Sequence, residues 1–165
     1  MGGFFIMKHS EFVAEIQLKY IPTNIKRRDL GSIRKSDEAY NFLYPLYDQD
    51  TIGLTEIFIV VFLNRASRVI GYNIHSIGGI TGTVVDIKLI LATALKCACS
   101  SILISHNHPS GNLEPSKNDK LQTNQLIKAL EVFNLDLLDH IIVAPERGDY
   151  YSFTDDWLCK SISNS

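Results

Sequence analysis

The sequence predicts an α/β fold in which helices flank a mixed β-sheet. Apolar runs of strand length recur along the chain, and many of their residues are β-branched or aromatic. Two pairs of these runs are typical of hairpins. Two amphipathic segments of helix length separate other apolar runs from each other. This order of strands and helices implies a mixed sheet that helices cover.

Length and composition agree with one globular domain. The chain has 165 residues, enough for one sizeable core. Hydrophobic residues make up 45% and charged residues 21%, which excludes a disordered chain. The net charge of −2 does not support nucleic acid as a tightly bound partner. Nothing in the sequence indicates an oligomeric state.

Cysteine usage and hydropathy predict a cytoplasmic protein that does not contact a membrane. An odd number of cysteines, three, in a chain too large to need disulfides favours a reducing compartment. The first seven residues contain too short an apolar run for a signal peptide. The longest apolar stretches elsewhere have the length of strands, so we expect no transmembrane segment.

Residues 1–51 are expected to form a strand–helix extension that packs on a main domain, residues 52–165. Apolar and polar residues alternate over 12–20, which predicts a half-buried strand. Ser36 is a suitable cap for a short helix that Pro45 would end.

The main domain is expected to begin with a hairpin and a helix. Residues 56–63 have the composition of a buried central strand, and residues 69–77 resemble its hairpin partner. Asp86 is a plausible cap for a helix that continues through Cys99. Because residues two apart on a helix do not face each other, we do not expect Cys97 and Cys99 to bind a metal together.

The second half of the main domain is predicted to be strand, helix and hairpin. Residues 101–105 form a short apolar run typical of a buried strand. Residues 137–144 and 150–153 are expected to pair as a hairpin. Residues 116–133 have helical periodicity, with four side chains expected to face inward: Leu121, Ile127, Leu130 and Phe133.

The loop between that short strand and that helix carries a metal-binding pattern. His106 and His108 are two residues apart where the strand ends, so in extended backbone both imidazoles point to one side. Pro115 and Ser116 begin a helix whose first turn contains Asp119, and this turn can face back toward the histidines. Two neutral nitrogens and one carboxylate suit Zn²⁺ and leave a fourth position for water. We therefore predict one zinc ion per chain.

These residues resemble a known family of metalloproteases. The JAMM (MPN-plus) signature HxHPxxxxxxSxxD is matched at five positions: His106, His108, Pro109, Ser116 and Asp119. The longer string HNHPSGNLEPSKND, the glycine-bearing segment before it, and Asp139 with His140 in a DHIIV segment resemble the RadC branch of that family. The similarity extends from about Ile52 to Phe153.

The resemblance implies a JAMM/MPN-like fold, similar to that of cytidine deaminases, in residues 52–165. It also implies a zinc metallopeptidase that cleaves peptide or isopeptide bonds of a peptide or protein substrate through a metal-activated water. A glutamate on an upstream strand acts as general base in such enzymes, and Glu56, in the context TEIF, is the best candidate. Ser116 would help to bind the oxyanion. Glu114 is closer in sequence to the ligands, but the family pattern has no acid at that position.

Some of these residues also have a structural interpretation. Ser116 and Asp119 have the spacing of a capping box, and a cap that orders the first helical turn would help to aim the carboxylate. His140 is expected to be structural or to support the ligands, with Asp139 contributing hydrogen bonds to the site.

Two other functions fit the sequence less well than the hydrolase. Zinc deaminases of nucleobases use an HxE segment followed by PCxxC, whereas position 108 is histidine and no PCxxC follows. The non-enzymatic alternative is a DNA-associated RadC-like module, linked to DNA repair without peptidase turnover. The negative net charge speaks against it, and the chain is too short at its amino end for the helix-hairpin-helix region that RadC-like proteins often carry.

Overall fold

The fold is described from a computed structural model of the chain, which covers residues 15, 17–26, 30–78 and 85–157. The helices are α1 (Ser36–Leu43), the 3₁₀ helix η3 (Tyr44–Leu46), α2 (Ile87–Lys96) and α3 (Lys117–Glu131). The strands are β1 (Ile57–Leu63), β2 (Val69–Ile77), β3 (Ser101–Asn107), β4 (Asp136–Val143) and β5 (Tyr150–Ser152). No helix of this part of the chain is long and apolar enough to cross a membrane.

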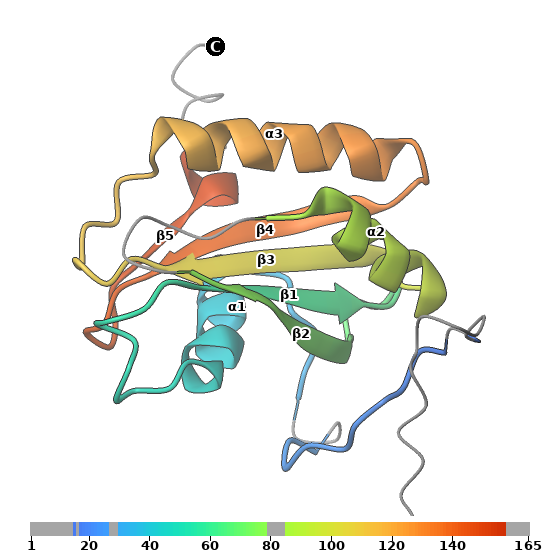
Figure 1. Cartoon of the computed structure of the whole chain (residues 1–165), viewed down its shortest axis with the longest axis horizontal. Coiled ribbons are helices and arrows are strands. Elements are labelled where there is room, and N and C mark those ends of the chain that lie inside the picture. Colours follow the sequence, from blue (N-terminus) through green and yellow to red (C-terminus); the bar gives the residue numbers. More distant parts are fainter. Residues whose placement is uncertain (1–14, 16, 27–29, 79–84, 158–165) are drawn as a thin grey trace, which may run out of the picture.

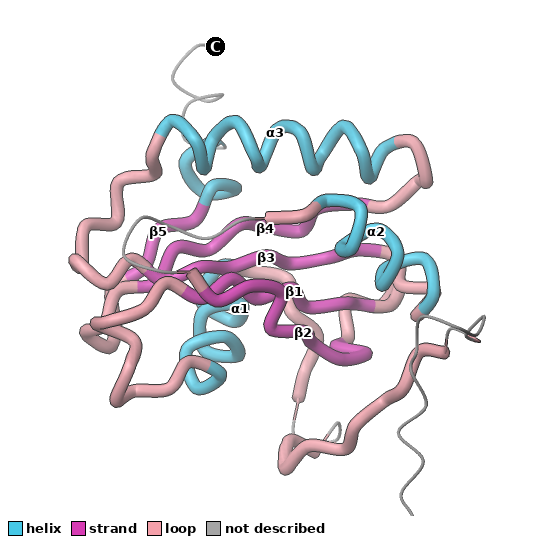
Figure 2. The backbone as a smooth tube through the Cα atoms, viewed as in Figure 1, coloured by secondary structure: helices cyan, strands magenta, loops and turns pink. Residues whose placement is uncertain are grey.

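The strands form one mixed sheet, which confirms the predicted fold class. Their order is β2-β1-β3-β4-β5, and only β3 and β4 run parallel. Helix α3 makes the crossover between these two strands, as a parallel pair requires. Figures 1 and 2 show α2 and α3 over one face of the sheet and α1 against the other.

Each face of the sheet has its own hydrophobic core. Strand β1 contributes to both because its side chains alternate: Ile59, Val61 and Leu63 pack on the side of α1, whereas Phe58, Val60 and Phe62 pack on the side of α2 and α3. Strands β1 and β3 are buried on both faces, which fits their continuous apolar sequences. These central strands are therefore a rigid base for the residues at their ends.

The predicted strand near the amino end does not form in the described residues. Residues 17–20 have no regular secondary structure, and residues 12–14 and 16 lie outside the described part of the chain. The expected short helix is present as α1, but its N-cap residue is Lys35 and not Ser36, which is the first helical residue. Its side chains Ala39, Tyr40 and Leu43 join the core of the sheet.

Helix α2 begins as predicted but ends earlier. The Asp86 carboxylate caps it by accepting hydrogen bonds from two backbone N–H groups. The helix ends at Lys96, and Ala98 takes a left-handed conformation (φ 51°) while the N–H of Cys99 donates to the carbonyl of Ala94. The argument that Cys97 and Cys99 point apart on a helix is therefore wrong. Burial and the neighbouring Cys97 thiol raise the pKa of the Cys99 thiol to about 12.

The buried face of α3 differs in part from the prediction. Its buried residues are Asp119, Thr123, Leu126 and Leu130, which follow the four-and-three spacing of a single stripe. Leu121 lies off this stripe and is 56% exposed, and Phe133 follows the end of the helix and is 45% exposed. At the carboxyl end, Phe153 does not extend the last strand but starts a helical segment, residues 153–157.

Candidate metal centre

The three predicted ligands meet at the carboxyl end of β3. Strand β3 is longer than expected and includes His106, while His108 follows it and donates its N–H to the carbonyl of Val143 at the end of β4. The chain then reverses and α3 brings Asp119 back. The nearest ligand atoms of the three side chains all lie within 4.8 Å of one another.

A capping box fixes the first turn of α3. The Ser116 hydroxyl accepts a hydrogen bond from the N–H of Asp119 at 3.1 Å, and the Asp119 Oδ2 accepts one from the N–H of Ser116 at 2.7 Å. This confirms the capping interpretation of the sequence. The Asp119 carboxylate then lies 3.5 Å from the Nε2 of His106 and 3.7 Å from that of His108.

A chain of hydrogen bonds determines which nitrogen of His106 carries a proton. The Thr123 hydroxyl donates its one proton to the carbonyl of Asp119 at 2.6 Å, so it must accept from the Nδ1 of His140 at 2.7 Å. Burial lowers the pKa of His140 well below its usual value, so this ring is neutral and its Nε2 carries a lone pair. That Nε2 lies 2.8 Å from the Nδ1 of His106, which must donate to it. The Nε2 of His106 is therefore the unprotonated nitrogen.

His108 has the same tautomer for a different reason. Its Nδ1 lies 2.5 Å from the carbonyl oxygen of Asn112, which can only accept, so the proton is on Nδ1. The Nε2 atoms of His106 and His108 are 2.9 Å apart. Two lone pairs at this distance repel unless a proton or a metal ion lies between them.

The charges at the centre suit a bound cation. Burial lowers the pKa of His106 to about 4, despite the nearby carboxylate. Hydrogen bonding to Asp119 raises the pKa of His108, so a proton competes with a metal ion at this ring. Burial alone would raise the pKa of Asp119, but His108, His106 and Ser116 together hold it well below its usual range. Two imidazole nitrogens and a carboxylate fit Zn²⁺ by the chemistry of the donor set.

The site is closed on one side and open on the other. His106 is 1% exposed, whereas the side chain of His108 is 17% exposed and Ser116 lies on the surface. A fourth position for water or substrate can lie on this open side.

Glu56 lies at the edge of the same centre but outside the group of ligand atoms. Phe58 pairs with His106 at the end of the antiparallel ladder of β1 and β3, and Glu56 lies two residues before Phe58 just as His108 lies two residues after His106. The Glu56 charge is one of the groups that raise the pKa of His108, which shows that it lies within electrostatic range. The half-buried Glu56 therefore stays the predicted base, next to the ligands.

Comparison with known proteins identifies the family. The model of the RadC-like JAB domain matches residues 33–158. The chain belongs to this family. A UPF0758 protein of Flavobacterium johnsoniae is 36% identical over 129 residues, which are 78% of this chain and 54% of the relative. The chain thus spans about half the length of the curated relative that it matches.

The match confirms the resemblance to the RadC branch of the JAMM/MPN family, including the fold. It also begins at residue 33, so the RadC-like match includes α1. The division of the chain at residues 51 and 52 stays a prediction, as does its cytoplasmic location.

Two residues of this JAB domain support the centre although the sequence did not single them out. Thr123 lies one helical turn after Asp119, and Asn107 is the residue between the two histidines. Thr123 could have been found from its i+4 spacing to a ligand. Asn107 could have been found from its alternate position in the strand, which turns it away from the histidines.

Aromatic packing also holds the ring of His140. Phe153 stacks on it with ring centroids 4.6 Å apart. Asp139 supports the site by hydrogen bonds to the backbone of His140 and not to the ligands: its carboxylate accepts from the N–H groups of His140 and Thr154 and from the Ser152 hydroxyl. Since strand residues alternate, Asp139 points to the opposite face and fixes the segment that carries Phe153.

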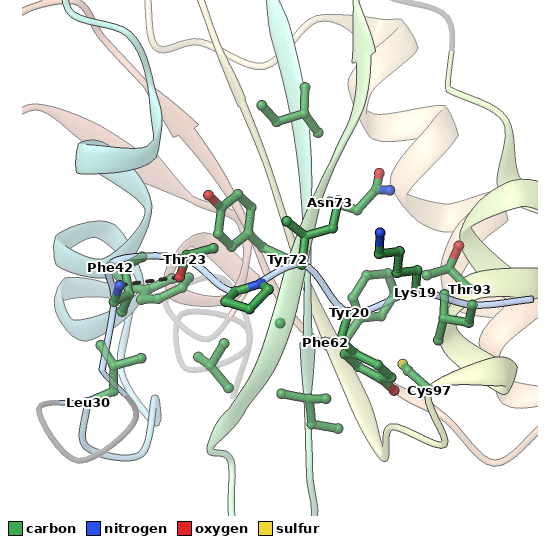
Figure 3. Close-up of a pocket in the computed structure, with 18 residues that line it drawn as sticks. Lys19, Tyr20, Thr23, Leu30, Phe42, Phe62, Tyr72, Asn73, Thr93 and Cys97 are labelled. Atoms are coloured by element: carbon green, nitrogen blue, oxygen red, sulfur yellow. Dashed lines mark hydrogen bonds between the residues drawn. The ribbon is translucent and has the colours of Figure 1, made fainter.

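A groove of about 710 Å³ lies elsewhere in the domain, where residues 18–25 cross β2. Figure 3 shows this segment passing over the strand, with α1 on one side and α2 on the other. Its lining includes Lys19, Tyr20, Phe62, Tyr72, Asn73 and Cys97. None of the three ligands, His106, His108 and Asp119, lines this groove, so it is separate from the metal centre.

Proposed function

We propose that this JAB domain is a zinc-dependent hydrolase that cleaves peptide or isopeptide bonds. The observation that carries the proposal is the convergence of two imidazole Nε2 atoms and one carboxylate at a centre with an open side. Membership of the RadC-like JAB family supports a metallohydrolase. The bond type is the finer part of the proposal, and it rests on the resemblance to JAMM peptidases.

His106, His108 and Asp119 would hold the zinc ion. Zinc bound there would act as a Lewis acid and make hydroxide available near pH 7. Glu56 would take a proton from the attacking water and deliver it to the leaving amine, because an expelled amine must be protonated. The Ser116 hydroxyl accepts a bond from the N–H of Asp119, which leaves its own proton to donate to the carbonyl oxygen that gains charge.

The proposal is tested by metal content and hydrolysis together. Elemental analysis should find about one zinc per chain, lost in His106→Ala and in Asp119→Ala. Libraries of peptides and of isopeptide-linked peptides, read by mass spectrometry, identify a cleaved substrate. Glu56→Gln should retain the metal and lower hydrolysis about 10²- to 10⁴-fold.

Two outcomes would contradict it. One is a carefully purified protein that contains and binds no zinc. The other is salt-dependent DNA binding without hydrolysis of either library and without any effect of Glu56→Gln, which would favour the DNA-associated module.

A further inference from the structure

We propose that Asn107 positions Glu56 relative to the histidine ligands. The role assigned to Glu56 rests on the function proposed above, whereas the contacts of Asn107 do not. The residue lies at the end of β3 between His106 and His108, and its side chain is completely buried.

The Asn107 amide makes three hydrogen bonds to one short segment of backbone. Its Nδ2 donates to the carbonyl oxygens of Ile52 at 2.6 Å and Thr55 at 2.9 Å. Its Oδ1 accepts from the N–H of Ile57 at 2.7 Å. Both donor hydrogens and the acceptor oxygen are therefore used, and every partner belongs to the chain leading into β1.

This segment contains the predicted base. Glu56 lies between Thr55 and Ile57, so the amide holds the main chain immediately before and after it. The carbonyl of Glu56 itself accepts from the N–H of Gly78 at 2.8 Å. The backbone around Glu56 is thus held by hydrogen bonds from Asn107 in β3 and from Gly78, which follows β2.

The Asn107 side chain connects β1 and β3 beyond the point where their backbone pairing ends. Backbone pairing between β1 and β3 ends at Phe58 and His106. Glu56 lies two residues beyond that pair, where the Asn107 amide supplies the connection between the two strands. The position of the Glu56 backbone therefore depends on the residue between the two histidine ligands.

Only an amide satisfies this set of partners. Two carbonyl oxygens need donors and one N–H needs an acceptor, which also fixes the orientation of the amide. An aspartate of the same size would place an oxygen against both carbonyls and repel them. Asn107→Asp is accordingly a sharp probe that changes little in volume.

The test uses the full chain loaded with zinc or with cobalt. We compare Asn107→Asp, Asn107→Ser and Glu56→Gln with a matched control, Asn64→Ala. Asn64 lies just past the other end of β1, where its Oδ1 accepts from two N–H groups of the turn. The control thus removes a similar amide from the turn at the other end of β1, away from the ligands.

Five quantities are measured: metal affinity by competition with a chromophoric chelator, kcat, KM, the pH–rate profile, and the pH titration of the visible cobalt spectrum. We expect both Asn107 variants to bind metal within about threefold of wild type, because other contacts hold the ligands. Their kcat should fall about 10²-fold, as expected for a misplaced catalytic group, with KM little changed. The pH–rate profiles and cobalt titrations of both Asn107 variants should shift in the direction seen for Glu56→Gln. Asn64→Ala should lower stability and leave kcat, the pH–rate profile and the cobalt titration unchanged.

Two results would overturn the proposal. In the first, the folded Asn107 variants, checked by circular dichroism, lose only stability and keep the wild-type kcat and cobalt titration. In the second, they lose metal affinity in parallel with activity, which would place their effect on the ligands. The serine variant provides the test if the aspartate variant does not fold.

The cobalt titration separates this proposal from the proposed function. If the wild type cleaves no peptide, the peptidase proposal fails. A common shift of the cobalt titration in Glu56→Gln and the Asn107 variants would still support positioning of Glu56. A shift in Glu56→Gln alone would overturn it.

Discussion

His106 owes its tautomer to residues that do not reach the open side of the site. Thr123 and His140 form a relay that ends with a proton on the Nδ1 of His106 and leaves the Nε2 for a metal. Such supporting contacts commonly change metal affinity by one to two orders of magnitude. The relay therefore gives a residue-level prediction about zinc binding.

Thr123→Val should lower zinc affinity about 10- to 100-fold, because His140 loses the acceptor that fixes its ring. Chelator competition at constant pH measures the effect. The matched control is Thr93→Val, since Thr93 makes the same hydroxyl bond to a carbonyl one turn earlier, in α2. Equal zinc affinity of the two variants would contradict the relay.

The sequence predicts the three metal ligands better than the residues that support them. The spacing of His106, His108 and Asp119 is local, so strand alternation and one helical turn suffice to bring them together. His140 is 34 positions from His106, and its contact depends on the parallel pairing of β3 and β4. That register follows from packing over the whole sheet, which local spacing does not contain.

At the scale of elements, the start of α3 connects folding to the site. Ser116→Ala should lower the free energy of unfolding by about 1 kcal/mol, because the N–H of Asp119 loses its acceptor. Urea unfolding of the chelator-treated protein measures this without a contribution from bound metal. Ser116→Thr, which keeps a hydroxyl, should lose less. Equal stability of alanine variant and wild type would show that the cap contributes nothing.

Element boundaries were predicted best where the sequence carries strong local signals. Strand β2 matches its predicted bounds, because residues 64–68 separate two continuous β-type runs. The predicted end of α2 at Cys99 is wrong, because apolar residues continue to recur after the helix ends at Lys96. The left-handed Ala98 that ends this helix is neither glycine nor asparagine, so composition gave no stop signal.

For the whole molecule, the topology explains why the centre forms at this end of the sheet. Strands β3 and β4 run parallel, so their carboxyl ends lie together, and the antiparallel β1 begins at the same edge. Helix α3 starts there on its way between the parallel strands. Ligands from β3 and α3, and Glu56 ahead of β1, therefore come together beside two buried strands.

Burial of neutral histidines makes the stability of the whole molecule depend on pH. Burial lowers the pKa of His106 to about 4 and that of His140 well below its usual value, whereas both rings have a pKa near 6.5 when unfolded. Between about pH 6.5 and 4 the unfolded chain therefore binds protons that the native protein excludes. His108 has the opposite sign, because its pKa is raised and the native protein already holds that proton.

The metal-free protein should accordingly become less stable as the pH falls from about 6.5 toward 4, since stability rises with pH wherever the unfolded state binds more protons. Each excluded proton contributes a slope of at most about 1.4 kcal/mol per pH unit. Urea unfolding at several pH values, after treatment with a chelator, measures the slope. His140→Leu removes one of the two buried neutral rings and should lower the slope of the free energy of unfolding against pH. A free energy of unfolding that does not change with pH would contradict the buried neutral rings. Zinc should raise stability at neutral pH by binding only the folded centre, and this gain should shrink in the same acidic range as protons compete for His108.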